Sequence, residues 1–178
     1  MASSPSTSSL VRSPRSVIIA LLFATVAKIL VIPAYRSTDF DVHRNWLALT
    51  KHLPLSEWYF DDVNGTTMHT LDYPPSFAFF EYFLSTNLIT DSLLEAELLD
   101  ESCLALLPDA KNSVSSACVS FHRATVIISD LVLWLGAYVA SWAVFPNDAI
   151  KCRWTFLLVV LNPGLLWLDH VHFQYNGM

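Results

Sequence analysis

The run that decides the fold is VIIALLFATVAKILVIPAY, residues 17–35. At about 1.5 Å per residue, a helix over this run crosses a bilayer core of about 30 Å. Its one charged residue, Lys28, lies either near the far interface or against a protein interior. A cleaved signal peptide is the alternative, but the apolar region is too long for one and no A-x-A site follows it. We therefore predict a retained membrane helix.

The composition of the whole chain is that of a membrane protein. Of its 178 residues, 53% are hydrophobic and 15% are charged, and the mean hydropathy is +0.43. Soluble domains have about 25% charged residues. The net charge is −6 and no basic stripe is present, so nucleic-acid binding has no electrostatic support. The predicted fold class is an all-α polytopic membrane protein.

Two further apolar runs are candidates for crossing the membrane. Residues 124–145 are interrupted only by Asp130, and residues 154–168 form a shorter run that contains Asn162-Pro163-Gly164. The shorter run is predicted to span, or to form a broken or re-entrant helix, which is tolerated only where protein or a cavity covers the backbone. Residues 77–89 are too short to cross and contain Glu81, which favours an amphipathic helix in the membrane surface.

Basic residues predict the orientation of these runs. Arg12 and Arg15 precede the first run, Lys151 and Arg153 separate the last two, and cytoplasmic loops are enriched in such residues. Both pairs fall on one side if the chain crosses at every run. The predicted organisation is a disordered cytoplasmic tail (1–16), a membrane helix (17–35), a luminal loop (36–123), a membrane helix (124–145), a cytoplasmic loop (146–153), a transmembrane or re-entrant helix (154–168) and the start of a luminal loop (169–178).

The luminal loop is predicted to have two parts. Residues 36–90 are rich in aromatics and prolines and should be folded, whereas residues 91–116 are acidic and read as a mobile insertion. Asn64 begins an N-glycosylation sequon, which gives weak support to a luminal location. Cys103 and Cys118 share the loop, and the sequence leaves open whether they form a disulfide; Cys152 lies on the cytoplasmic side.

A polar cluster, STDFDVHRNW at residues 37–46, directly follows the first helix. The apolar spacing beyond it predicts a helix from about Phe40 to Leu53, with Thr38 or Asp39 as its N-cap. The functional alternative for Asp39 is a carboxylate at the mouth of a membrane cavity, where it can accept a proton from a sugar hydroxyl. The spacing alone favours the cap, although one carboxylate can do both.

Three other features of the sequence also have two interpretations each. The segment LDYPP, residues 71–75, is a rigid bracket that starts a helix near Ser76, or it holds Asp72 or Tyr73 near a polyol substrate. Arg123 is an ordinary flanking charge, or its planar guanidinium binds phosphate at the membrane surface. Asp130 inside an apolar span is functional by default, or it pairs with another helix.

The last candidate site along the sequence is the segment DHVHFQYNG, residues 169–177. His170 and His172 share a face only if the segment is extended, which with Asp169 would permit a metal site, but a metal needs more ligands than these. We favour a luminal loop that offers amide, imidazole and phenol groups to sugar hydroxyls or phosphate. Membrane anchoring by Phe173 and Tyr175 is the simpler alternative.

Taken together, these motifs resemble the dolichyl-phosphate-glucose-dependent α-1,3-glucosyltransferases of the asparagine-linked glycosylation pathway, which are endoplasmic-reticulum enzymes of the GT-C fold. The resemblance covers residues 38 to about 83 and 121 to 177. At residues 42–45, VHRN is similar to the branch that adds the second glucose, whereas the first-glucose branch tends to have GDFEAQRHW in place of residues 38–46. The motifs are TDFDVHRNW (38–46), LPLSEWY (53–59), LDYPP (71–75) and DHVHFQYNG (169–177).

The resemblance implies transfer of glucose from dolichyl phosphate glucose to Glc1Man9GlcNAc2 diphosphodolichol, with inversion of the anomeric centre in one displacement. It implies that Asp39 is the base that activates the acceptor hydroxyl, and that Asp72 and the two histidines line the cavity. The residues expected to bind substrate are Asp41, Arg44, Asp72, Tyr73, Arg123, His170, His172 and Gln174.

The same resemblance sets expectations for ligands and location. No cofactor and no metal are expected beyond the lipid donor, and the partners are the dolichyl-linked donor and acceptor and membrane lipid, with no nucleic acid and no obligate protein partner. The site is expected to face the lumen of the endoplasmic reticulum from a multi-pass protein. Family members are far longer, so this chain is expected to be an N-terminal fragment that is inactive alone.

Three rival functions remain at this stage. The first is the first-glucose branch, acting on Man9GlcNAc2 diphosphodolichol. The second is a non-catalytic membrane subunit that binds other molecules. The third is a metal-dependent enzyme of the same fold, with Asp39 and Asp41 as the metal ligands.

Overall fold

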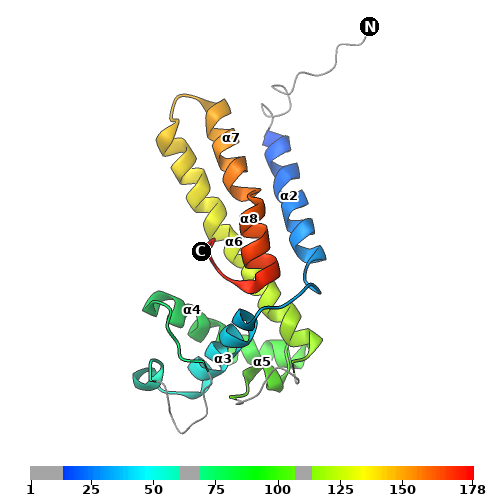
Figure 1. Ribbon diagram of the computed structural model, residues 1–178, viewed down its shortest axis with the longest axis vertical. Helices are drawn as coiled ribbons and strands as arrows, with labels where there is room; N and C mark the ends of the chain where they lie inside the picture. Colours follow the sequence, from blue (N-terminus) through cyan, green and yellow to red (C-terminus); the bar gives the residue numbers. More distant parts are fainter. Residues whose placement is uncertain (1–13, 61–68, 107–113) are drawn as a thin grey trace. The chain divides into compact units, whose positions relative to one another are not determined.

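The structure is a computed structural model that describes residues 14–60, 69–106 and 114–178. Most of the expected cytoplasmic tail, Arg12 and the Asn64 sequon lie outside the described residues. Every regular element in the described ranges is helical, and Figure 1 shows their order. The elements are α2 (Pro14–Leu30), α3 (Thr38–His52), η1 (Leu55–Glu57), α4 (Pro75–Ser85), α5 (Asn87–Glu95), η2 (Glu101–Leu104), α6 (Ser116–Val144), α7 (Ala149–Val160), α8 (Pro163–Leu165) and the π-helix η3 (Leu166–Phe173).

The chain divides into two compact units. The first takes in the chain up to Tyr35 together with Thr125–Met178, and the second is Arg36–Ala124. Helix α6 therefore begins in the second unit and continues through the first. Each unit has its own buried residues and is described by itself.

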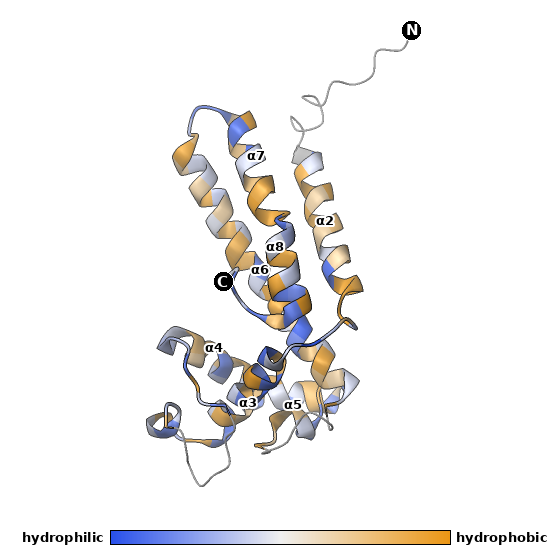
Figure 2. Cartoon of the chain, in the orientation of Figure 1, coloured by the Kyte–Doolittle hydropathy of each residue, from blue (hydrophilic) through white to orange (hydrophobic). Residues whose placement is uncertain are grey.

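The first unit is a bundle of apolar helices, in which α2, α6 and α7 run side by side (Figure 1). Its core joins Ala137 of α6 to Phe156, Leu157 and Val160 of α7, and Leu21 of α2 packs against them. Outside this core the helices stay apolar, as Figure 2 shows. Exposed large apolar side chains include Ile19, Leu22, Phe23, Leu131, Leu135, Trp142, Leu158 and Trp167.

Two helical stretches of the described chain are long and apolar enough to cross a membrane, Ser116–Val144 and Ala149–Phe173. Both carry apolar residues on their outer surfaces as well as in the core. A surface of this kind is stable in lipid and marks a site of protein or membrane contact in water. The second stretch is interrupted by the break at Asn162.

Helix α2 differs in its limits from the expected 17–35 span. It begins at Pro14 and ends at Leu30, and turns follow in which the Ala34 N–H donates to the Val31 carbonyl at 2.9 Å. Pro33 explains the early end, because a proline disfavours the helical conformation of the residue before it. Its 17 residues give a helix of about 25 Å at about 1.5 Å per residue.

The helix that starts with α7 breaks at the expected place. Helix α7 ends at Val160, and the Asn162 side-chain oxygen accepts a hydrogen bond from the Gly164 N–H at 2.8 Å, which caps α8. Pro163 occupies the first turn of α8, where its missing N–H is not needed. The π-helix η3 continues from α8 to Phe173, so residues 169–173 are helical and the expectation of a luminal loop beginning at Asp169 is wrong.

The second unit is built on the packing of α3 against α4. Helix α3 confirms the predicted helix, but its N-cap is Ser37, whose Oγ accepts from the Asp39 N–H at 3.2 Å, and not Thr38 or Asp39. An N-cap needs an extended backbone, and Ser37 has it at ψ 175°. Helix α4 starts beside the predicted Ser76.

The expected surface helix over residues 77–89 is two helices, α4 and α5. The chain turns at Thr86, whose ψ of 145° is extended, and α5 begins at Asn87. Lys51 of α3 joins the two helices, because its Nζ donates to the Ser85 carbonyl at 3.3 Å and to the Thr90 hydroxyl at 2.8 Å. The apolar run therefore belongs to two elements of a folded unit.

The described part of the acidic stretch, residues 91–106, is packed and does not fit a loose insertion. Leu99 and Leu104 are buried, and the ring of His52 donates from Nε2 to the Leu104 carbonyl at 2.8 Å. Cys103 forms a disulfide with Cys118, the pairing that the sequence left open, with 5.4 Å between their Cα atoms. The bridge ties η2 to the first turn of α6.

We expect Cys103 and Cys118 to be recovered as one disulfide-linked peptide pair from the membrane-purified protein, with Cys152 as a thiol. Closing a 15-residue separation contributes about 3 kcal/mol in the chain-entropy picture. Cys103→Ser should therefore lower the thermal midpoint clearly more than Cys152→Ala does. Recovery of free thiols at both loop cysteines would contradict the pairing.

Candidate active site

Asp39 lies in the first turn of α3, half-buried, two residues after the cap residue Ser37. The positive end of the helix dipole favours a carboxylate there. The next residue, Phe40, is buried, and the guanidinium of Arg36 lies 5.1 Å from the centre of its ring. Asp39 is therefore a partly accessible acidic group whose neighbour in the sequence, Phe40, is buried.

One helical turn further along the same face of α3 lies His43. It is buried among aromatic rings, with ring centroids 4.8 Å away for Trp46, 5.6 Å for Tyr73 and 5.3 Å for Phe77. Its Nδ1 lies 3.4 Å from Oε1 of Glu81 on α4, which is fully buried. Sequence reasoning treated Glu81 only as an interruption of an apolar run, so this pair was missed.

The predicted pair Asp72 and Tyr73 lies in the same unit as Asp39. Asp72 is exposed, whereas the Tyr73 ring packs on α3 and its carbonyl accepts from the Tyr59 hydroxyl at 3.0 Å. The indole of Trp46 donates to the Thr70 carbonyl at 3.0 Å and so holds the bracket on α3. The structure thus brings together two of the motifs that are far apart in the sequence.

Two predicted substrate-binding cations are buried. Arg44 donates from one terminal nitrogen to the carbonyls of Ser102, at 3.2 Å, and Ala105, at 3.0 Å. Burial lowers the pKa of Arg44, and the charge of Asp41 opposes that shift. Arg123 is also buried. Arg44 therefore holds the η2 segment on α3, a role that the sequence did not suggest.

His122, next to Arg123, continues the polar interior of this unit. Its ring lies 5.3 Å from that of Phe40, edge to face. It also lies close to the sulfurs of Cys103 and Cys118, which are joined to each other in the disulfide. The start of α6 thus contacts the same helix turn that carries Asp39.

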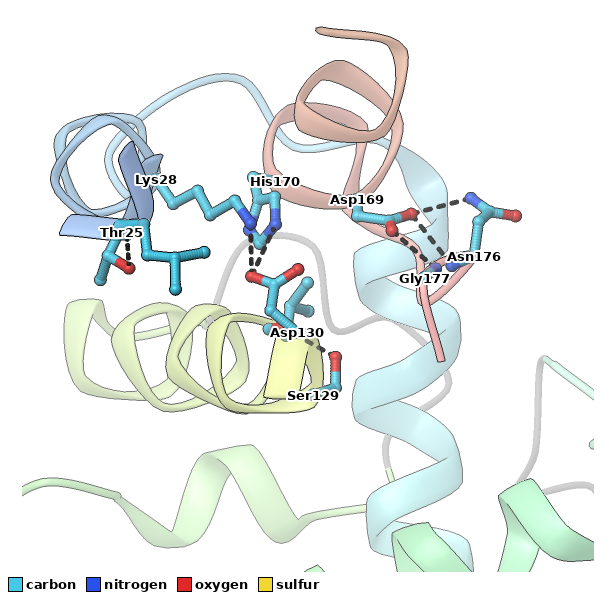
Figure 3. Close-up of polar contacts among 10 residues, drawn as sticks. Thr25, Lys28, Ser129, Asp130, Asp169, His170, Asn176 and Gly177 are labelled. Atoms are coloured by element: carbon cyan, nitrogen blue, oxygen red, sulfur yellow. Dashed lines mark hydrogen bonds and ion pairs between the residues drawn. The ribbon is translucent and has the colours of Figure 1, made fainter. Parts of the chain in front are cut away.

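The first unit holds a separate cluster of buried charged groups (Figure 3). Asp130 of α6 accepts from Lys28 of α2 at 2.7 Å and lies 3.2 Å from Nε2 of His170 on η3, both through Oδ2. All three side chains are at most 6% exposed. The sequence left Lys28 near the far interface or against a protein interior, and Asp130 as functional or paired with another helix. The structure pairs the two residues across 102 residues.

Asp169 organises the end of the chain. Its Oδ1 accepts from the backbone N–H of Asn176 at 3.0 Å and from its side chain at 2.8 Å, and its Oδ2 accepts from the Gly177 N–H at 2.9 Å (Figure 3). Phe173, with a φ of 82°, reverses the backbone so that this contact is made. A Cβ on Gly177 would lie 3.3 Å from Oδ2, so the site suits glycine.

The remaining predicted residues of this segment are partly enclosed. His172 and Gln174 are half-buried. Because residues 169–173 are helical, His170 and His172 do not face the same side, and His170 and Asp169 are directed to different partners. This disfavours the metal arrangement that an extended segment would have permitted.

Comparison with known proteins finds one matching family and several similar proteins. A model described as the ALG6, ALG8 glycosyltransferase family matches residues 24–178. A dolichyl pyrophosphate Glc1Man9GlcNAc2 alpha-1,3-glucosyltransferase from Arabidopsis thaliana is 46% identical over 154 residues, covering 86% of this chain and 28% of that protein. Its namesake from Saccharomyces cerevisiae is 41% identical over 150 residues, covering 84% and 24%. The chain thus spans about a quarter of the length of the curated relatives that it matches.

Lys28→Met should destabilise the protein strongly, because it leaves Asp130 without its cationic partner in an apolar bundle. Breaking a buried pair from one side costs about 3–5 kcal/mol, whereas replacing both partners by apolar residues is often close to neutral. We therefore expect the double variant Lys28→Met/Asp130→Leu to unfold at a higher temperature than Lys28→Met alone.

The matched control is Lys151→Met, which removes an exposed ion pair with Asp148 and should leave the midpoint unchanged. Thermal unfolding in detergent measures all three variants. A Lys28→Met midpoint equal to that of the unmodified protein would show that the pair does not stabilise the fold.

Proposed function

The chain belongs to the ALG6, ALG8 glycosyltransferase family, and from that membership we propose that the protein transfers glucose from dolichyl phosphate glucose to Glc1Man9GlcNAc2 diphosphodolichol. The observation that carries the proposal is the shared name of the relatives, which specifies an acceptor that already holds one glucose. The segment VHRN at residues 42–45 favours the same branch over the one that adds the first glucose.

The proposed reaction is a single displacement at the anomeric carbon of the donor glucose. A hydroxyl of the acceptor's terminal glucose attacks that carbon, the bond to the phosphate oxygen breaks, and dolichyl phosphate leaves with the electron pair. Because attack and departure occur on opposite sides, the anomeric configuration inverts. The phosphate needs little help from an acid, but the attacking hydroxyl must lose its proton to a base.

We propose Asp39 as that base. Three features support it: the carboxylate is half-buried and therefore partly accessible, it stands at the positive end of α3, and the side chains around it include the buried ring of Phe40. A general base of this kind contributes about 10²–10⁴-fold to the rate. Asp72 and Tyr73 belong to the bracket that packs on α3, and they are proposed to contact the sugars.

The proposed location is the membrane of the endoplasmic reticulum, with the second unit in the lumen. Disulfides form in oxidising compartments such as that lumen, and Cys103–Cys118 lies in the second unit. Lys151 and Arg153 follow the α6–α7 turn, which the enrichment of basic residues assigns to the cytoplasm. No cofactor is proposed beyond the lipid donor.

We expect Asp39→Asn to lower the rate of second-glucose transfer about 10²–10⁴-fold, because asparagine cannot take the proton. The full-length protein that contains this sequence is expressed in microsomes without their own second glucosyltransferase, and the conversion of Glc1Man9GlcNAc2 diphosphodolichol is followed. Asp91→Asn, an exposed change on α5, is the matched control. A fully active Asp39→Asn protein would leave Asp39 with a structural role only.

Two further arms of the same assay test the rival functions. Conversion of Man9GlcNAc2 diphosphodolichol in place of the one-glucose acceptor would favour the first-glucose branch. Loss of activity in EDTA, restored by a divalent cation, would favour a metal-dependent enzyme. No transfer to either acceptor by the unmodified, correctly expressed protein would favour a non-catalytic subunit.

A further inference from the structure

Glu81 is an acidic residue in an apolar environment. It is the only charged residue in α4, its side chain is 0% exposed, and it faces α3. Oε1 lies 3.4 Å from His43, and Oε2 has no hydrogen-bond partner among the described residues. A buried carboxylate anion needs several partners to offset its lost hydration, and a single long contact does not provide them.

The neighbours of the pair are largely aromatic. The imidazole of His43 is 2% exposed and is surrounded by the rings of Trp46, Tyr73 and Phe77. Burial raises the pKa of Glu81, and the weaker effect of the hydrogen bond and charge of His43 opposes that shift. The side chain therefore fits the site as a neutral carboxylic acid that donates its proton to Nδ1 of His43.

This pair lies about one helical turn along α3 from the proposed base. His43 follows Asp39 by four residues on α3, so the two side chains occupy the same helix face in successive turns. Glu81 joins α4 to that face near the proposed base, and Thr50 and Lys51 bind Ser85 of α4 further along α3. Movement of α3 along or around its axis would break the hydrogen bond and displace Asp39 together with it.

We propose that Glu81 is a positioning residue, which acts as a neutral acid to donate a hydrogen bond to His43 and thereby fixes the face of α3 that carries Asp39. The inference rests on the proposed function of Asp39 and assigns a second, non-reacting acid to the same site. Glu81 does not touch substrate in this proposal. It acts through His43 and through the orientation of α3.

Other ionisable groups of the second unit lie near this pair and have to be separated from it in a pH experiment. Arg44 is the next residue on α3, and His122 of α6 interacts electrostatically with both His43 and Arg44. Lys51 contacts α4 one turn beyond Glu81, through the Ser85 carbonyl. Substitution of Glu81 itself isolates its contribution, because these groups remain in every variant.

Glu81→Gln should keep the activity, because the glutamine amide is neutral and can donate to Nδ1 of His43 as the acid does. Glu81→Leu keeps the apolar contacts but removes the donor, so we expect kcat to fall about tenfold, with KM close to that of the unmodified protein. The variants are assayed in the full-length protein that contains this sequence, with Glu95→Gln, an exposed change on α5, as the matched control.

The pH dependence of kcat gives a readout that a purely structural role would not move, and the pH dependence of thermal stability reports whether the side chain is neutral. Because burial raises the pKa of Glu81, the folded protein holds the Glu81 proton more tightly than the unfolded chain does. The stability of the folded protein therefore falls as pH rises from the unfolded-state pKa of Glu81 through its folded-state pKa. The unmodified protein should therefore lose thermal stability and kcat with rising pH in a way that Glu81→Gln does not.

The outcomes separate the two proposals. If Glu81→Gln is as impaired as Glu81→Leu, the ionised form is required and the positioning proposal is wrong; full activity in Glu81→Leu would also overturn it. If the unmodified protein transfers no glucose, the proposed function fails by itself, and the thermal midpoints of Glu81→Gln against pH still decide whether the side chain is neutral. Identical pH dependence of those midpoints in Glu81→Gln and the unmodified protein would overturn the inference.

Discussion

A charged side chain in an apolar bundle has to find a partner within the protein, and the first unit is arranged around that requirement. Lys28, Asp130 and His170 come from three separate helices and meet at one carboxylate oxygen. The pairing fixes which face of α2 turns toward α6, and it leaves the outer faces of both helices apolar. It also fixes η3 in place through His170. The backbone reverses direction at Phe173, the last residue of η3.

The second unit stabilises several of its buried polar groups in a different way, by hydrogen bonds to backbone carbonyls. Arg44, Trp46 and His52 of α3 all donate to carbonyls of segments far along the chain. These bonds hold the start of the bracket and the η2 segment against one helix. Asp39 stands at the end of the most heavily contacted helix of the unit, which is a rigid base for a group that must be placed accurately.

The parts that the sequence predicts well are those that depend on local pattern. The apolar runs predict α6 and the broken helix after it, and the spacing after Phe40 predicts α3. The motif resemblance predicts the family, because it depends on residue identity and not on geometry. The cap of α3 was assigned one or two residues too late, since Ser37, Thr38 and Asp39 are all good caps and only the backbone angles distinguish them.

The parts that the sequence misses depend on contacts between distant residues. A partner on another helix was one of the interpretations of Asp130, yet nothing local identifies Lys28 as that partner. Arg44 was expected to bind substrate, and its actual carbonyl partners lie in a stretch that reads as a mobile insertion. Glu81 was overlooked because its burial is created by α3, whereas the run around it reads as a surface helix.

The contacts of Asp169 also bear on how the protein ages. Asn-Gly linkages deamidate when the glycine nitrogen attacks the asparagine side-chain carbonyl to form a succinimide ring. Here the Gly177 nitrogen donates to Asp169, and the Asn176 amide is held by Asp169 and by Gln174. Neither group is free to rotate toward the other, so we expect this linkage to deamidate more slowly in the folded protein than after unfolding, which peptide mass mapping of stored samples can measure. One carboxylate thus protects a chemically labile bond as well as shaping the chain around it.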